Sequence, residues 1–266
     1  WAEEYYALFM EMGTGKTKVA IDTMAVLFEA DKINAALVVA PKGVYDNWVK
    51  NEIPAHLPDR IQRQILRWTP AKTKRMETNL KDFIVDKING IKIFVINIEA
   101  FSTSRGTEAA LAFLYQNPDN MVIVDESTTI KNRKAARTKN IVRLQEYSKY
   151  RRILTGSPIT KSPMDLFSQC DFLKNKALGF NSYFAFQARY ANIQQRTMGH
   201  RSFQQIVGYR RLEELSEKLD LFSNRVLKED CLDLPEKVYV RREIEFTPEQ
   251  KKLYTQMKKL ALLVFL

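Results

Sequence analysis

A short glycine-containing stretch near the start of the chain has the residue types needed to bind a nucleotide phosphate. It reads "FMEMGTGKT" over residues 9–17 and lies between an apolar run and a helical pattern. Glycines let the backbone take positive φ and turn N–H groups toward an anion, and the following helix adds its positive dipole end. A lysine can reach the β- and γ-phosphates, and a hydroxyl can bind Mg²⁺. We therefore expect ATP and Mg²⁺ to be held by Gly13, Thr14, Gly15, Lys16 and Thr17.

The stretch departs from the full phosphate-loop pattern at one position. That pattern requires a glycine five residues before Gly15, and this chain has Met10 there. The shorter G-x-G-K-T core remains, between the expected strand and helix. The alternative interpretation is a tight turn that holds no ligand.

A pair of carboxylates could complete such a site. Asp125 and Glu126 follow the apolar run "MVIV", so they are expected where a buried strand ends. Ligands of open α/β sheets bind at that edge. We expect Asp125 to hold the metal together with Thr17, and Glu126 to act as general base or to orient the attacking water, so that Lys16, Asp125 and Glu126 form the catalytic set. Acidic residues at strand ends also cap helices, which is the alternative for this pair.

These groups can meet only if the chain folds as a sheet with aligned strand ends. Short, mostly continuous apolar runs alternate with helical patterns, as in a parallel sheet that is buried on both faces. We predict a mostly parallel α/β sheet flanked by helices. The predicted strands are 5–10, 35–40, 63–68, 92–97, 121–126 and 151–156, and the predicted helices are 16–30, 44–53, 71–83, 106–116, 133–146 and 163–174.

The pattern changes after residue 175. Residues 176–222 read as a helical insertion without an obvious strand, and residues 183–211 interleave aromatic residues with arginines. Such a mixture suits either a nucleic-acid contact or aromatic packing on the sheet with solvated arginines. A strand is predicted at 237–246, followed by a helix with Thr247 as its N-cap. The expected organisation is a sheet lobe at 1–175, the insertion at 176–222, and a strand and helix within 223–266.

Composition limits the remaining classes. The net charge of +11 favours a polyanionic partner, nucleic acid first and an anionic membrane surface second. Two cysteines and two histidines, in no metal-binding spacing, argue against a zinc site or a disulfide framework and favour an intracellular setting. No apolar run is long enough for a membrane span, and the acidic N-terminal residues do not resemble a signal peptide.

Taken together, the motifs resemble those of superfamily-two helicases, most of all the Swi/Snf-like DNA-dependent ATPases. Motifs I, Ia, Ib, II and III are matched in order by "EMGTGKT", "VVAPKGVYDNWVKNE", "VINIEAF", "VIVDEST" and "RRILTGSPITKSPMDLFS". The segment 224–254 resembles the one that follows the first motor lobe in that branch. The resemblance implies a RecA-like P-loop NTPase lobe. The chain has Thr128 where the family often has histidine.

The resemblance also implies roles for two further segments. Pro41 and Lys42 would contact one strand of the nucleic acid, whereas Trp48 is assigned mainly to the core. Thr155, Gly156 and Ser157 would link the nucleotide state to the nucleic-acid path. The alternatives are a solvated lysine at position 42 and a simple turn and helix cap at 155–157.

The function that the resemblance implies is ATP hydrolysis coupled to movement along double-stranded DNA. A motor of this kind needs a second RecA-like lobe with arginine fingers, which does not follow within this sequence, so we expect weak hydrolysis by this lobe alone. Two other classes remain open: a nucleic-acid-binding module without productive ATPase activity, and another P-loop phosphotransferase.

Overall fold

The computed structural model describes residues 2–70, 73–198, 201–233 and 238–264, and the chain forms two units, residues 1–232 and 233–266. The first unit is built on a seven-stranded sheet in the order β3-β4-β2-β5-β6-β1-β9, and every pairing in it is parallel. The strands are β1 (Tyr5–Met10), β2 (Ala35–Ala40), β3 (Arg63–Arg67), β4 (Ile91–Asn97), β5 (Asn120–Asp125), β6 (Tyr150–Leu154) and β9 (Ser223–Val226).

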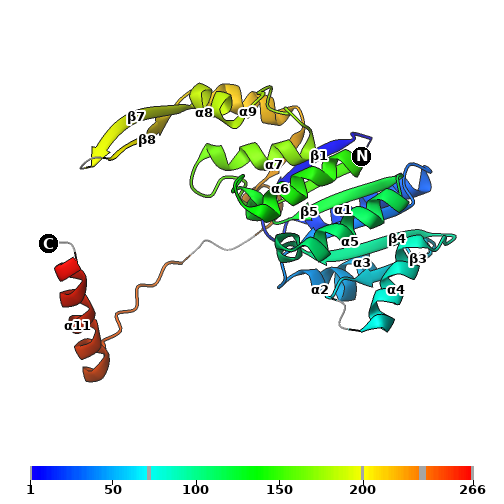
Figure 1. Ribbon diagram of the computed structural model, residues 1–266, viewed down its shortest axis with the longest axis horizontal. Helices are drawn as coiled ribbons and strands as arrows, with labels where there is room; N and C mark the ends of the chain where they lie inside the picture. The colour runs from blue at the N-terminus through cyan, green and yellow to red at the C-terminus, as the bar shows by residue number, and fades with distance from the viewer. Residues whose placement is uncertain (1, 71–72, 199–200, 234–237, 265–266) are drawn as a thin grey trace. The chain divides into compact units, whose positions relative to one another are not determined.

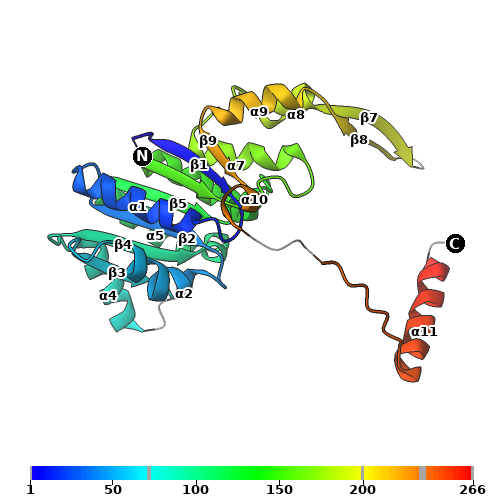
Figure 2. The same cartoon turned by 180° about the vertical axis from the view of Figure 1, so that it is seen from behind.

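Helices cover both faces of this sheet (Figures 1 and 2). One face packs against α1 (Lys16–Glu29) and a continuous helical segment made of α2 (Tyr45–Asn47), the π-helical turn η1 (Trp48–Glu52) and α3 (Ile53–His56). The other face packs against α4 (Lys74–Val85), α5 (Ser104–Gln116), α6 (Ala136–Arg143), α7 (Leu166–Leu173) and α8 (Tyr183–Tyr190).

The sheet is buried on both faces because its strands are apolar at successive positions. In β2, Leu37 and Val39 belong to the core on one face, and Val38 and Ala40 belong to the core on the other. Side chains alternate across a strand, so a continuous apolar run supplies both layers. The predicted α/β class and all six predicted strands are confirmed.

The edge strand β9 was not predicted. It has only four residues, and its sequence Ser-Asn-Arg-Val is mostly polar. It joins the sheet by pairing with β1, Ala7 opposite Ser223 and Met10 opposite Val226. An edge strand can be half exposed to solvent, so it does not need a continuous apolar run. Its position is set by backbone pairing with β1, and the sequence pattern does not reveal it.

The prediction that the insertion is helical throughout was wrong. Its two ends are helical, α8 and α9 (Leu212–Asp220), but β7 (Ala191–Met198) and β8 (Arg201–Tyr209) form a separate antiparallel two-stranded sheet between them. We call this pair the ribbon. Its exposed residues show no hydrophobic alternation, so the pattern that reveals half-buried strands is missing.

The second unit contains α11 (Pro248–Val264). The predicted N-cap is confirmed, since the N–H of Gln250 donates to Thr247 Oγ1 at 3.3 Å, and Thr247 N–H donates to Gln250 Oε1 at 3.1 Å. The strand predicted at 237–246 is absent over residues 238–246, and residue 237 lies outside the described residues. Among the described helices, none has both the length and the apolar character needed to span a bilayer.

Candidate nucleotide site at the carboxyl edge of the sheet

The glycine turn between β1 and α1 forms an open cradle. Gly13 and Gly15 have φ of 87° and 89°, in the left-handed region that glycine adopts without steric cost. A Cβ built on either residue would meet no heavy atom within 4 Å, so both glycines face open space on that side. Thr14 closes the turn, because its hydroxyl donates to the carbonyl oxygen of Glu11 at 2.8 Å. The first N–H groups of α1 lack intrahelical acceptors and are available for an anion.

The sheet brings the lysine and the acidic pair to the same place. β5 and β1 lie on either side of β6, and all three end at the same edge. Lys16 Nζ lies 3.8 Å from Glu126 Oε1. Thr17 is the second residue of α1, directly after Lys16, and is half-buried. Glu126 has φ of 47°, an unusual value for a residue other than glycine, which turns the chain out of the sheet directly after Asp125.

Asp125 is more deeply buried than Glu126. It is 3% exposed; its Oδ1 accepts from the Glu126 N–H at 3.0 Å, and its Oδ2 accepts from the Trp48 indole N–H at 2.9 Å. Burial raises the pKa of this carboxyl above its usual range, although the hydrogen bond from Trp48 opposes that shift. A buried carboxylate with few compensating charges is a favourable place for a cation.

Trp48 was assigned to the core from sequence, and that assignment is incomplete. Its ring is fully buried in the core, yet its N–H reaches the carboxylate that is expected to hold the metal. The two residues are 77 positions apart, so no local pattern indicates the contact. Trp48 follows Pro41 and Lys42 by only a few residues, and these two lie directly after β2 at the same edge of the sheet. Lys42 is exposed.

The segment after β6 contacts both Glu126 and the glycine turn. Thr155 Oγ1 donates to Glu126 Oε2 at 3.3 Å and accepts from the Ser157 N–H at 3.2 Å. Gly156 lies against the glycine turn: a Cβ on it would be 3.3 Å from Glu11 Cα and 3.4 Å from the Met10 carbonyl oxygen. A movement of the glycine turn would therefore displace residues 155–157 directly.

Gln169 is a further connecting residue that sequence reasoning missed. Its Oε1 accepts from the Ser127 hydroxyl at 2.7 Å, directly after the acidic pair, and its Nε2 donates to the Pro158 carbonyl oxygen at 2.8 Å. It is completely buried on α7. Nothing in the local sequence distinguishes it from a surface glutamine of an amphipathic helix, because the contact spans 42 positions.

The structure therefore places most of the predicted site residues together. Lys16, Glu126 and Thr155 are in mutual contact through Glu126, Asp125 adjoins them, and Gly156 touches the glycine turn. Pro41 and Lys42 lie at the same edge, but no hydrogen bond or ion pair joins them to this group among the described residues. The donor set of one hydroxyl, one buried carboxylate and one lysine beside an open cradle fits a Mg²⁺-bound triphosphate.

A family model and several known proteins match this chain along most of its length. The family model described as the SNF2-related domain matches residues 7–265. The chain is 27% identical over 240 residues to the DNA annealing helicase and endonuclease ZRANB3 of Mus musculus, covering 90% of this chain and 21% of that protein. It is 26% identical over 254 residues to the chromatin-remodeling ATPase INO80 of Candida albicans, covering 93% and 17%.

A solved structure shows the same fold. The Sulfolobus solfataricus SWI2/SNF2 ATPase core in complex with double-stranded DNA superposes with a TM-score of 0.60 at 23% identity, over 94% of this chain and 46% of that one. The chain thus spans about a fifth of the two curated relatives and about half of the solved chain.

Proposed function

Because this chain belongs to the SNF2-related domain family, we propose that it is the ATP-binding lobe of a motor that moves along double-stranded DNA. The observation that carries the proposal is the convergence of Lys16, Glu126 and the buried Asp125 beside an open glycine cradle. The relatives named above include a DNA helicase and a chromatin-remodeling ATPase, and the solved relative is a complex with duplex DNA.

Each part of the site has a role in this proposal. Backbone N–H groups of residues 13–15 hold the phosphates, and the ammonium of Lys16 lies against the β- and γ-phosphates. Thr17 and Asp125 would hold Mg²⁺, which would supply positive charge to neutralise the phosphates. Glu126 accepts the proton of the attacking water or orients that water. Its contact with Lys16 is long, so Lys16 can turn toward a phosphate without losing a tight partner.

Residues 155–157 would pass the nucleotide state on to the DNA path. They contact Glu126 on one side and the glycine turn on the other. Pro41 and Lys42 would contact the phosphates of one DNA strand, which fixes position without reading sequence. A second RecA-like lobe would supply the arginine finger, so hydrolysis by this lobe alone should be slow.

The test compares Lys16→Ala with Lys18→Ala in equilibrium binding of a fluorescent ATP analogue with Mg²⁺. Both variants lose one positive charge from the same turn of α1, but Lys18 only forms an exposed ion pair with Asp22. Loss of a charge-assisted contact should weaken binding about 10–100-fold in Lys16→Ala and leave Lys18→Ala within about twofold. Equal affinities in the two variants would overturn the nucleotide site.

The enzymatic part of the proposal needs a second measurement. ATP turnover is followed with and without duplex DNA, for this chain and for a longer chain that carries a second lobe. DNA-stimulated release of phosphate to water by the longer chain supports the motor. Transfer of phosphate to an acceptor would indicate another phosphotransferase, and no turnover with retained DNA binding would indicate a binding module.

A further inference from the structure

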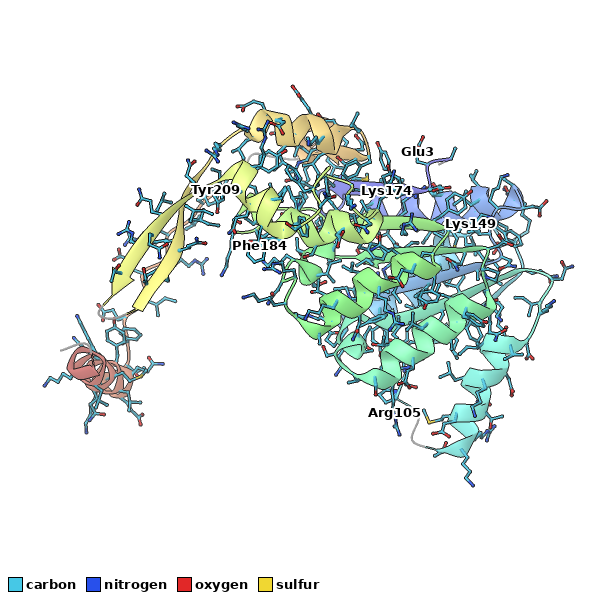
Figure 3. The ribbon with its side chains drawn as sticks, turned by 45° about the horizontal axis from the view of Figure 1, so that its top comes forward. Glu3, Arg105, Lys149, Lys174, Phe184 and Tyr209 are labelled. Atoms are coloured by element: carbon cyan, nitrogen blue, oxygen red, sulfur yellow. The ribbon has the colours of Figure 1, made fainter. Side chains whose placement is uncertain are left out.

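The β7–β8 ribbon contacts the core at Ala191 and Ile206, but most of its length lacks the packing that stabilises the rest of the first unit. Residues 192–197 and 202–205 are exposed, and Figure 3 shows side chains projecting on both sides of the two strands. An isolated two-stranded ribbon is only marginally stable in water, so a core does not explain its length. Its residues are therefore better explained by contact with something outside this unit.

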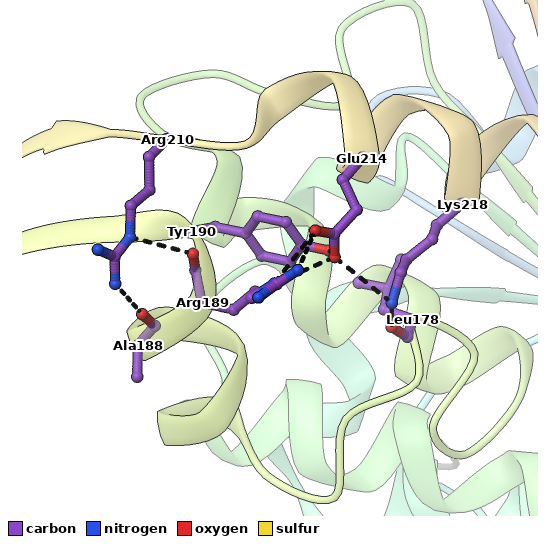
Figure 4. Close-up of polar contacts among 7 residues, drawn as sticks. All are labelled: Leu178, Ala188, Arg189, Tyr190, Arg210, Glu214 and Lys218. Atoms are coloured by element: carbon purple, nitrogen blue, oxygen red, sulfur yellow. Dashed lines mark hydrogen bonds and ion pairs between the residues drawn. The ribbon is translucent and has the colours of Figure 1, made fainter.

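The base of the ribbon, in contrast, is firmly attached. Glu214 on α9 accepts hydrogen bonds from Tyr190 Oη at 2.9 Å and from Arg189 Nη2 at 2.5 Å (Figure 4). Arg210 donates to the carbonyl oxygens of Ala188 at 2.6 Å and Arg189 at 3.3 Å. The ring of Tyr190 is buried in the core. Arg189 and Arg210 thus have structural roles at the base of the ribbon.

The stretch of sequence that contains the ribbon carries only cations among its charged residues, and the first carboxylates after it are Glu213 and Glu214 on α9. Residues 172–212 include seven Lys and Arg residues and no Asp or Glu. The exposed guanidinium group of Arg196 has no ion-pair or hydrogen-bond partner among the described residues. A 41-residue stretch without a carboxylate is complementary to a polyanion, whereas a surface for a protein partner would normally carry both signs.

One face of the ribbon has side chains suited to nucleic acid. Residues that are directly opposite in an antiparallel pair point to the same face, and the register places Gln194 opposite Gln205 and Arg196 opposite Phe203. Arginine contacts phosphates, glutamine amides can hydrogen-bond base edges, and an exposed aromatic ring can stack or wedge. Phe203 is 46% exposed.

We propose that this face of the ribbon is an additional DNA contact, which lies along a groove of the duplex that the lobe binds. The proposal rests on the proposed function and adds a second point of contact to the one expected at Pro41 and Lys42. A two-stranded ribbon fits the major groove of B-form DNA, which is about 12 Å wide. The eight residues of β7 extend about 26 Å at about 3.3 Å per residue, enough to cross that groove.

The test measures binding of a fluorescent duplex of about 25 base pairs by anisotropy over a range of KCl concentrations. The ribbon variant is Arg196→Ala with Phe203→Ala. The control variant is Lys32→Ala with Tyr115→Ala, which also removes one exposed cation and one exposed aromatic ring but lies away from the ribbon. Nucleotide binding of each variant is measured as a check on folding, because none of the four residues adjoins the nucleotide site.

The ribbon variant should bind the duplex about tenfold more weakly and lose about one unit of the slope of log K against log salt, since one phosphate contact is removed. A second variant, Gln194→Ala with Gln205→Ala, should weaken binding without changing the slope. The control should stay within about twofold of the parent chain.

Unchanged affinity and slope in the ribbon variant, or the same loss in the control, would overturn the inference and assign the ribbon to a partner of another class, such as a protein. That result would leave the proposed function intact, provided that the parent chain binds the duplex. Failure of the parent chain to bind any duplex would overturn both proposals.

Discussion

The carboxyl edge of the sheet and the β7–β8 ribbon differ in how deeply their side chains are buried and in how far apart in the sequence their neighbours are. At the edge, groups from four distant parts of the chain meet within hydrogen-bonding distance, and Asp125, Trp48, Thr155 and Gln169 are all nearly or fully buried. In the ribbon, residues 192–197 and 202–205 are exposed, and Ala191 and Ile206 contact the core of the sheet. Chemistry on a small ligand needs fixed atoms, whereas contact with a long polymer needs reach and charge.

The comparison is tested most strongly by the hydrogen bond between Trp48 and Asp125. Trp48→Phe keeps an aromatic ring in the core but removes the N–H that fixes Asp125 Oδ2. We expect about tenfold more Mg²⁺ to be needed for half-maximal binding of a fluorescent ATP analogue, because a hydrogen bond to a charged group contributes about 1.5–3 kcal/mol.

The matched control is Trp68→Phe, since Trp68 is also buried but belongs to the core cluster on the other face of the sheet. Both variants lose ring volume, so a shared change in melting temperature reports packing. An Mg²⁺ requirement that rises equally in both would show that Trp48 acts through the core alone.

Alanine substitutions at Gly156, beside the nucleotide site, and at Gly208, in the ribbon, should have smaller effects that also differ between the two regions. In Gly156→Ala the new methyl group would lie 3.3–3.4 Å from the backbone of the glycine turn. These contacts are tight, and the backbone of the turn would have to shift to relieve them. In Gly208→Ala the nearest atom is the Asn192 side-chain nitrogen at 3.5 Å, an ordinary contact. We expect Gly156→Ala to lose about 1–2 kcal/mol of unfolding free energy and to bind ATP several-fold more weakly, as overpacking does.

Gly208→Ala should be close to neutral in both measurements, which are denaturant unfolding and nucleotide titration. Equal behaviour of the two variants would mean that the segment 155–157 is not packed against the glycine turn in solution.

The smallest expected effect is the loss of fold stability caused by the buried carboxylate of Asp125. Burial raises the pKa of Asp125 above its unfolded value, so ionisation of this group destabilises the fold. The destabilisation is absent below the unfolded pKa, grows as pH rises toward the folded pKa, and is complete above it. Asp125→Asn should therefore raise the melting temperature at pH 7 without Mg²⁺ by a few degrees at most, and should abolish the gain that Mg²⁺ and ATP give the parent chain.

At a pH below the unfolded pKa the two chains should melt at the same temperature. Thermal unfolding followed by circular dichroism at several pH values provides the measurement. A lower melting temperature for Asp125→Asn at pH 7 would show that the carboxylate stabilises the fold, contrary to the direction of its pKa shift.

The sequence alone determined the parallel sheet and the positions of its ligand-binding groups. Short continuous apolar runs that alternate with helical patterns favour strands buried on both faces of a parallel sheet. Parallel strands end at one edge, so the positions of Lys16, Asp125 and Glu126 in the chain predict that they meet. Tertiary structure decided which atoms are in contact. The contacts of Trp48 with Asp125 and of Gln169 with Ser127 span 77 and 42 positions, and the ribbon and β9 consist of strands held by backbone pairing. Such contacts depend on how packed elements are aligned, and neither periodicity nor a local motif encodes that alignment.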